Sequence, residues 1–168
     1  RRAPRQRLAC GALRYVSTRG EAPPRDMKGG LLAGLAEDGG LFVPEAWPEL
    51  SAEEWRALRG LPYAELAARL IHRFTGNTLS LEALRGMAEA AYGGFGHPAV
   101  APLVQLDHRR FVLELFHGPT LAFKDMALQL LGRLFDQVLE RRGERITIVG
   151  ATSGDTGSAA IEACRDRA

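Results

Sequence analysis

The sequence predicts an α/β fold that opens with a small, mostly helical unit and continues into the start of a domain with a parallel sheet. Residues 14–96 carry apolar side chains mainly at helical spacing, interrupted by glycine and proline. Residues 97–168 alternate short apolar runs with helical patterns, which is typical of α/β domains. The second part has too few strands for a finished sheet, so we expect an incomplete, truncated α/β domain.

Composition and charge limit the class of protein. The chain of 168 residues is 46% hydrophobic and 25% charged, which is sufficient for a packed core. The first 14 residues hold five arginines and no acidic residue, so the net charge of +2 leaves the rest mildly acidic. Nucleic-acid binding is therefore not expected. We expect residues 1–13 to be a disordered or non-native extension, since this segment is short for a transit peptide and has no serine.

Two further counts exclude other classes. No run approaches the roughly 18 to 20 apolar residues of a membrane-spanning helix, so we expect a soluble protein. Cys10 and Cys164 lie far apart without a CxxC pair, which argues against a disulfide framework and a cysteine zinc site. We expect reduced thiols, a cytoplasmic protein and no metal site.

The elements of the helical unit follow from periodicity and stop signals. Ser51 and Glu54 have capping-box spacing, Pro62 suits a first helical turn, and Ser80 can cap the last helix. Gly39 and Gly40 end the first helix. The elements expected here are strands at 14–17 and 41–44 and helices at 27–38, 51–58, 62–76 and 80–92.

The second part begins with a hairpin-like pattern and then alternates helix and strand. Apolar runs at 102–106 and 111–116 flank a polar turn. An amphipathic helix is predicted for 123–142, and the apolar run 146–149 predicts a buried parallel strand. A helix should begin at about Thr156.

The loop at residues 150–158 is a candidate ligand site. It holds three glycines, one acidic residue and several hydroxyl side chains between the expected strand and the expected helix. Exposed amide groups at a helix amino terminus favour an anion. The sequence lacks the GK[ST] ending of a Walker loop and is not GxGxxG. The alternative is an ordinary strand-to-helix turn with serine and threonine caps.

The segment from His117 to Asp125 is a second candidate. Only two lysines occur, Lys28 and Lys124, so chemistry that needs a lysine amine has two candidates. Lys124 follows an expected strand, and ligands of open α/β sheets bind beyond the carboxyl ends of strands. Phe123 can shield the amine from water, as a Schiff-base lysine requires. The alternative is a solvated charge, which is the interpretation we keep for Lys28.

Four ordered stretches resemble the threonine synthase family, pyridoxal-phosphate enzymes of the tryptophan-synthase β-like fold (fold type II). The segment 114–125, Glu-Leu-Phe-His-Gly-Pro-Thr-Leu-Ala-Phe-Lys-Asp, resembles that family's lysine segment. Residues 15–20 look like its amino-terminal signature, 34–45 are a further match, and 150–160 look like its substrate loop. The resemblance runs from Arg14 to the end of the chain.

The resemblance implies a function and a set of site residues. The family converts O-phospho-L-homoserine and water to L-threonine and phosphate. Lys124 matches the lysine that holds pyridoxal 5'-phosphate as a Schiff base and shuttles protons, with Phe123 beside it. Ser153, Gly154, Asp155 and Thr156 match the loop that receives the substrate carboxylate and lies near the cofactor. Many relatives in the wider fold have asparagine where Asp155 stands.

Two alternatives remain open. One is a threonine-synthase-like phospho-lyase, which eliminates phosphate without forming threonine. The other is a non-catalytic domain whose 150–158 loop holds a phosphate or nucleotide. The family's cofactor-phosphate loop would lie beyond Ala168, so we expect this chain by itself to lack a complete site and to be inactive.

Overall fold

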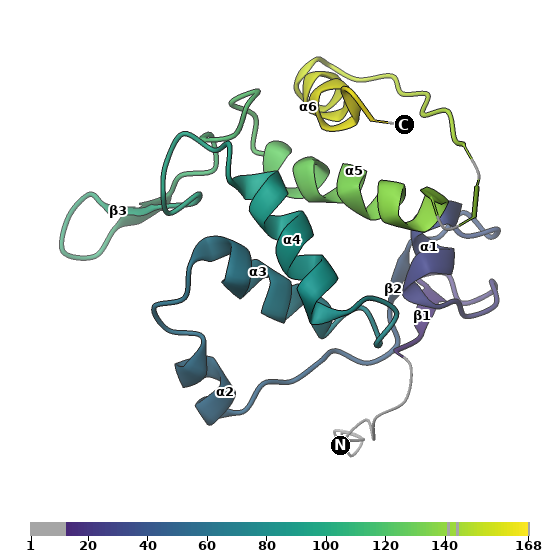
Figure 1. Ribbon diagram of the computed structural model, residues 1–168. Coiled ribbons are helices and arrows are strands. Elements are labelled where there is room, and N and C mark those ends of the chain that lie inside the picture. Colours follow the sequence, from purple (N-terminus) through teal and green to yellow (C-terminus); the bar gives the residue numbers. More distant parts are fainter. Residues whose placement is uncertain (1–12, 141, 144, 168) are drawn as a thin grey trace. The chain divides into compact units, whose positions relative to one another are not determined.

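The computed structural model describes residues 13–140, 142–143 and 145–167, and it divides into two compact units (Figure 1). The first unit consists of the chain up to Arg59 together with Arg69–Leu81. The second consists of Gly60–Ala68 and Glu82–Ala168. The expected extension at 1–13 lies outside the described residues except for Leu13. Among the described helices, none is long and apolar enough to cross a membrane.

A small antiparallel ribbon and a hydrogen-bonded turn around Asp38 organise the first unit. Strand β1 (Tyr15–Ser17) pairs with β2 (Phe42–Pro44), and α1 (Met27–Ala33) lies between them in the sequence. Asp38 accepts hydrogen bonds from the Ser17 hydroxyl and from three backbone N–H groups. The Ser17 bond, followed by these amides, lowers the pKa of the Asp38 carboxyl. Both expected strands are confirmed.

Helix capping explains the next elements. Helix α2 (Ala52–Ala57) begins with the predicted capping box, in which Ser51 accepts from the Glu54 amide and Glu54 accepts from the Ser51 amide. Helix α3 (Tyr63–His72) starts directly after Pro62, as expected, but ends earlier than residue 76. Its last four residues belong to the first unit and the others to the second.

Aromatic stacking marks the core of the second unit. Helix α4 (Leu81–Tyr92) buries Leu84 and Ala88 completely or nearly so. The Tyr92 ring meets Tyr63 and Phe95 edge to face, at centroid distances of 4.9 and 5.5 Å. The Tyr92 hydroxyl donates to the carbonyl of Met126 at 3.0 Å. Burial, and to a lesser extent Tyr63, raises the pKa of Tyr92 to about 12.

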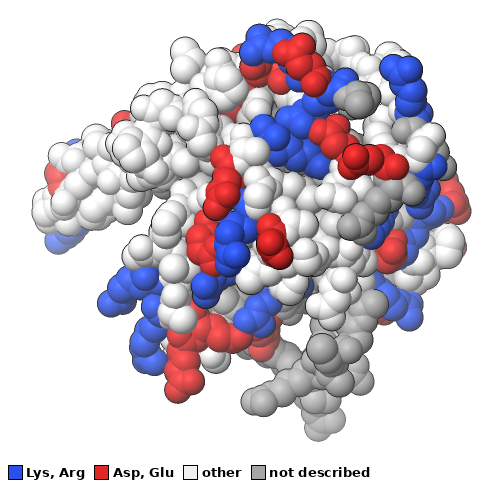
Figure 2. Space-filling view, in the orientation of Figure 1, with Lys and Arg blue, Asp and Glu red and all other residues white. Residues whose placement is uncertain are grey.

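The predicted hairpin is present, and it is exposed. Strands β3 (Leu103–Gln105) and β4 (Phe111–Leu113) pair antiparallel around the expected polar turn. Figure 2 shows the hairpin as a largely uncharged projection, with charged side chains near its tip. Apolar residues on both strands are more than one third exposed.

Two helices pack together after the hairpin. Helix α5 (Asp125–Glu140) and helix α6 (Asp155–Cys164) lie side by side (Figure 1). The contact is close because Gly132 has no side chain, and a Cβ there would lie 2.6 Å from the carbonyl oxygen of Ala163. The expected helices at 123–142 and from about residue 156 are therefore confirmed, with α6 beginning one residue earlier.

The prediction of a parallel strand at 146–149 is wrong, because the structure forms no strand there. Residues 145–154 have no regular secondary structure, and Ile146, Ile148 and Val149 are 45%, 57% and 92% exposed. A parallel strand forms only with neighbouring strands, and the described residues supply none for this segment. The domain division at residue 96 stays a prediction, since the two units share α3 and do not separate there.

Candidate functional site

Lys124 stands at the junction between the lysine segment and α5, the position expected for a reactive amine. Its side chain is 27% exposed, which makes it half-buried. The Nζ atom lies 4.3 Å from the centroid of the Phe123 ring and 3.6 Å from the Oδ2 atom of Asp155. Phe123 is itself exposed, so its ring shields the amine only in part. The Lys124 amine thus lies between an aromatic ring and a carboxylate.

The loop before α6 brings a second predicted segment to the same place. Asp155 begins α6, and its side chain is 71% exposed. The Oγ1 atom of Thr152 accepts from the backbone N–H groups of Gly154 and Gly157, at 3.2 and 3.0 Å. Thr152 therefore shapes the turn, while Ser153, Gly154 and Thr156 remain exposed. Exposed amides at the start of a helix attract an anion.

The carboxylate next to Lys124 in the sequence is turned into the protein. Asp125 is completely buried, and its carboxylate accepts from the backbone N–H and the hydroxyl of Thr120. Gly118 makes room for it, because a Cβ at that position would lie 2.5 Å from the Asp125 side chain. Lys124 and Asp125 thus follow each other in the chain but have different partners.

A histidine lies at the start of the same segment. His117 Nε2 lies 2.7 Å from Glu114 Oε2, and the His117 ring is 5.1 Å from that of His97. The backbone N–H of Gly96 donates to the His117 carbonyl at 2.8 Å. These contacts fix the entry to the lysine segment. They assign no chemical role to His117.

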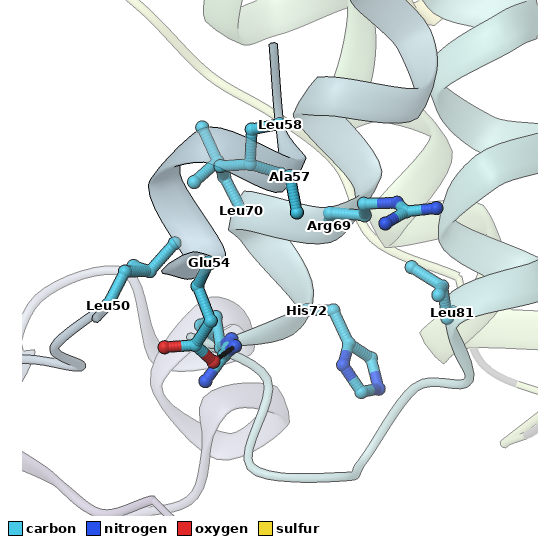
Figure 3. Close-up of a pocket in the computed structure, with 9 residues that line it drawn as sticks. Leu50, Glu54, Ala57, Leu58, Arg69, Leu70, His72 and Leu81 are labelled. Atoms are coloured by element: carbon cyan, nitrogen blue, oxygen red, sulfur yellow. Dashed lines mark hydrogen bonds and ion pairs between the residues drawn. The ribbon is translucent and has the colours of Figure 1, made fainter. Parts of the chain in front are cut away.

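A separate hollow lies in the first unit (Figure 3). It has a volume of about 340 Å³. It lies beside α2 and the end of α3, where Arg73 forms an ion pair with Glu54. The amide of Ser51 and then Arg73 lower the pKa of the Glu54 carboxyl. None of the predicted site residues lines this hollow. In the part of the chain that the structure describes, no cluster of three or more His, Cys, Asp or Glu side chains could hold a metal ion.

Known proteins match almost the whole chain. A family model described as "Threonine synthase N terminus" matches residues 14–92. Threonine synthase from Pseudomonas aeruginosa is 59% identical over 153 residues, which is 91% of this chain and 33% of the relative. A solved PLP-bound threonine synthase from Brucella melitensis is 58% identical with a TM-score of 0.90, over 93% of this chain and 34% of that chain. "Threonine synthase-like 2" from Rattus norvegicus is 42% identical over 149 residues, which is 88% of this chain and 31% of the relative.

These findings establish the fold class. The fold is that of the amino-terminal third of threonine synthases, which are pyridoxal-phosphate enzymes of fold type II. The chain is similar to the amino-terminal portion of threonine synthases. It spans about a third of the length of the relatives it matches.

The sequence identified two segments that meet, but it missed the residues that support them. The structure brings Asp155 to the Lys124 amine and places Phe123 beside it, whereas Ser153 and Thr156 lie in the exposed loop. Thr152 was not singled out, although a threonine two residues before a helix-capping glycine is a signal for a side-chain turn. The pairing of Thr120 with Asp125 was also missed, because burial of a carboxylate has no signature in a single sequence.

Proposed function

We propose that this chain is part of a threonine synthase that converts O-phospho-L-homoserine and water to L-threonine and phosphate with pyridoxal 5'-phosphate. The observation that carries the proposal is the 3.6 Å approach of Asp155 to Lys124, which unites the lysine segment with the loop before α6. Two segments that resemble family motifs, separated by a whole helix in the sequence, thereby form one site. The similarity of the chain to the amino-terminal portion of threonine synthases supports the same function.

The residues around Lys124 fit an aldehyde cofactor. The Lys124 side chain is half-buried and its amine lies against the Phe123 ring, and a lysine that is shielded from water is the kind of nucleophile that Schiff-base chemistry uses. When bound, pyridoxal phosphate withdraws electrons from the substrate carbon atoms and so permits proton loss next to them. Lys124 would hold the cofactor and would move protons once substrate replaces it. Phe123 would limit the access of water to the amine. Asp155 would contact the cofactor from the loop before α6.

The loop before α6 would bind the substrate. Ser153 and Thr156 carry hydroxyl groups on exposed residues at the amino terminus of α6, and Gly154, whose N–H donates to Thr152, lies exposed between them. A carboxylate there would gain from both the hydrogen bonds and the helix dipole. Thr152 already satisfies two neighbouring amides and keeps the turn in shape. This arrangement suits the α-carboxylate of an amino acid.

A second candidate is a threonine-synthase-like phospho-lyase, which is favoured by the 42% identity to the rat protein named "Threonine synthase-like 2". Both activities would use Lys124 and the same loop. They differ in whether water is added after phosphate leaves. A non-catalytic phosphate-binding domain would use the loop alone and would leave the amine unmodified.

The decisive experiment maps the cofactor and identifies the product. The full-length holoenzyme is reduced with borohydride, digested and searched for a pyridoxyl group on Lys124, with Lys28 as the internal control. A separate, unreduced sample of the holoenzyme, incubated with phosphohomoserine, should release phosphate and threonine in equal amounts. Phosphate without threonine would favour the phospho-lyase, and an unmodified Lys124 would exclude both enzymes. A cytoplasmic location also stays a prediction, which fractionation of cells would test.

A further inference from the structure

We propose that Thr120 and Asp125 are positioning residues that keep the Lys124 amine free to react. The inference rests on the proposed role of Lys124 and extends it to two residues that do not contact its amine. Thr120 engages the carboxylate of Asp125 and thereby separates it from the neighbouring lysine. A side-chain cluster inside the lysine segment would thus determine how readily Lys124 captures an aldehyde.

The contacts between the two side chains are short and fully enclosed. Asp125 is 0% exposed. Its Oδ2 atom accepts from the backbone N–H of Thr120 at 2.8 Å, and the Thr120 hydroxyl lies 2.9 Å from both carboxylate oxygens. Burial of a carboxylate is costly unless hydrogen bonds compensate it. Thr120 supplies that compensation through two donors.

The backbone between the two residues forms a tight turn. Leu121 adopts a left-handed conformation with φ of 62°, and its N–H donates to the carbonyl of Gly118 at 3.1 Å. The N–H of Asp125 donates to the carbonyl of Ala122 at 3.0 Å. A left-handed conformation is costly for leucine, so the surrounding contacts must hold it. The turn ends directly at Lys124, whose side chain emerges toward Asp155.

Chemistry explains why the separation matters. Schiff-base formation begins when the neutral amine nitrogen attacks the aldehyde carbon. A C–N bond then forms and becomes double, and the carbonyl oxygen leaves as water with both nitrogen protons. A carboxylate held against the amine favours the ammonium form, which has no lone pair to attack. Asp125 follows Lys124 directly in the sequence, and Thr120 holds its carboxylate in the interior. Asp155 lies 3.6 Å from the amine on an exposed helix start, where solvent weakens its attraction.

The test compares Thr120→Val with Thr120→Ser in the full-length enzyme. Valine keeps the shape and the backbone donor but removes the hydroxyl, whereas serine retains the hydroxyl. Two probes measure the reactivity of the Lys124 amine. One is the capture of pyridoxal phosphate by the apoenzyme, and the other is the trace acetylation of Lys124 relative to Lys28. We expect Thr120→Val to lower the capture of pyridoxal phosphate and the acetylation of Lys124 about tenfold each, because the lost hydroxyl donates a hydrogen bond to the charged Asp125 carboxylate. Thr120→Ser should stay within about twofold of the wild type.

A second variant separates positioning from a general loss of structure. Asp125→Asn removes the charge, and its amide can still accept from the Thr120 backbone and donate to the hydroxyl. Thr120→Val/Asp125→Asn should therefore recover most of the lost reactivity, although it has fewer native hydrogen bonds. If Thr120→Val fails to fold, Asp125→Asn alone carries the test and should react within about twofold of the wild type.

The outcomes distinguish this inference from the proposed function. Unchanged Lys124 reactivity in folded Thr120→Val, equal losses in the valine and serine variants, or no recovery in the double variant would each overturn the positioning role. A wild-type enzyme that captures no pyridoxal phosphate at Lys124 would overturn the proposed function. In that case the acetylation ratios still test the effect of Thr120 on the amine.

Discussion

The lysine segment at 114–125 and the stretch at 145–158 contribute to the same candidate site, yet they differ in burial. The lysine segment buries Gly118, Ala122 and Asp125 and closes on itself through short hydrogen bonds. The second stretch is exposed over almost its whole length, and Thr152 supplies its side-chain hydrogen bonds. The candidate site thus combines a buried segment with a segment that is exposed to solvent.

The difference follows from the range of the interactions. Turns and caps join residues that are two to five positions apart, so they form wherever the local sequence allows. A parallel strand is paired with strands that are distant in the sequence, and both its faces need cover. The three predictions below change one side of this comparison at a time, beginning with the largest expected effect.

Gly118→Ala should disrupt the packing of the lysine segment at 114–125. The new Cβ would lie 2.5 Å from the Cβ and Oδ2 atoms of Asp125, so the turn must shift. Overpacking of this kind destabilises by about 1 to 3 kcal/mol. Amide hydrogen exchange in residues 118–126 should accelerate by the corresponding factor. Gly94→Ala is the matched control, because nothing lies within 4 Å of its added Cβ. Equal exchange in both variants would show that the packing around Asp125 is not tight.

Thr152→Val should have a smaller effect, confined to the start of α6. The substitution removes the oxygen that accepts from Gly154 and Gly157 while keeping the volume of the side chain. Loss of a helix-capping side chain costs about 1 kcal/mol. Exchange of the first amides of α6 should therefore accelerate, whereas Thr152→Ser should preserve them. Protection that survives in the valine variant would mean that another group shapes this turn.

Val149→Thr should have the smallest effect. Val149 is 92% exposed, and substitutions at exposed positions away from caps and ion pairs usually change the free energy of unfolding by less than about 0.5 kcal/mol. Denaturant unfolding of the variant and of the parent chain would measure the difference. A loss well above that limit would mean that this stretch is buried, as its apolar sequence predicts for a parallel strand.

The outcome of the sequence analysis follows the same division between local and distant interactions. The capping box at Ser51, the start of α3 after Pro62 and the β3–β4 hairpin were predicted correctly, since each depends on neighbours in the sequence. Lys124 was expected near the 150–158 loop, because both follow segments assigned to one sheet. Asp155 of this loop lies 3.6 Å from Lys124, although the strand expected at 146–149 is not formed.

The errors and omissions have physical causes. The apolar run at 146–149 carries the composition of a buried strand, but pattern alone does not supply the partner strands that would bury it. The burial of Asp125 could not be predicted either, because a charged residue beside a lysine normally suggests an exposed ion pair. Its actual partner, Thr120, becomes evident only when the turn through Leu121 is known.

The burial of the tyrosines provides an optical record of alkaline unfolding. The chain has three tyrosines, and burial raises the pKa of Tyr15, Tyr63 and Tyr92. The folded protein therefore retains phenol protons that the unfolded chain releases near 10.0, the ordinary value, so stability falls as the pH rises above it. For Tyr92, the pH range over which stability falls extends to its raised pKa of about 12. Ultraviolet absorbance of phenolate would follow the release of these protons, and its rise toward pH 12 would report opening of the core around Tyr92, at the end of α4.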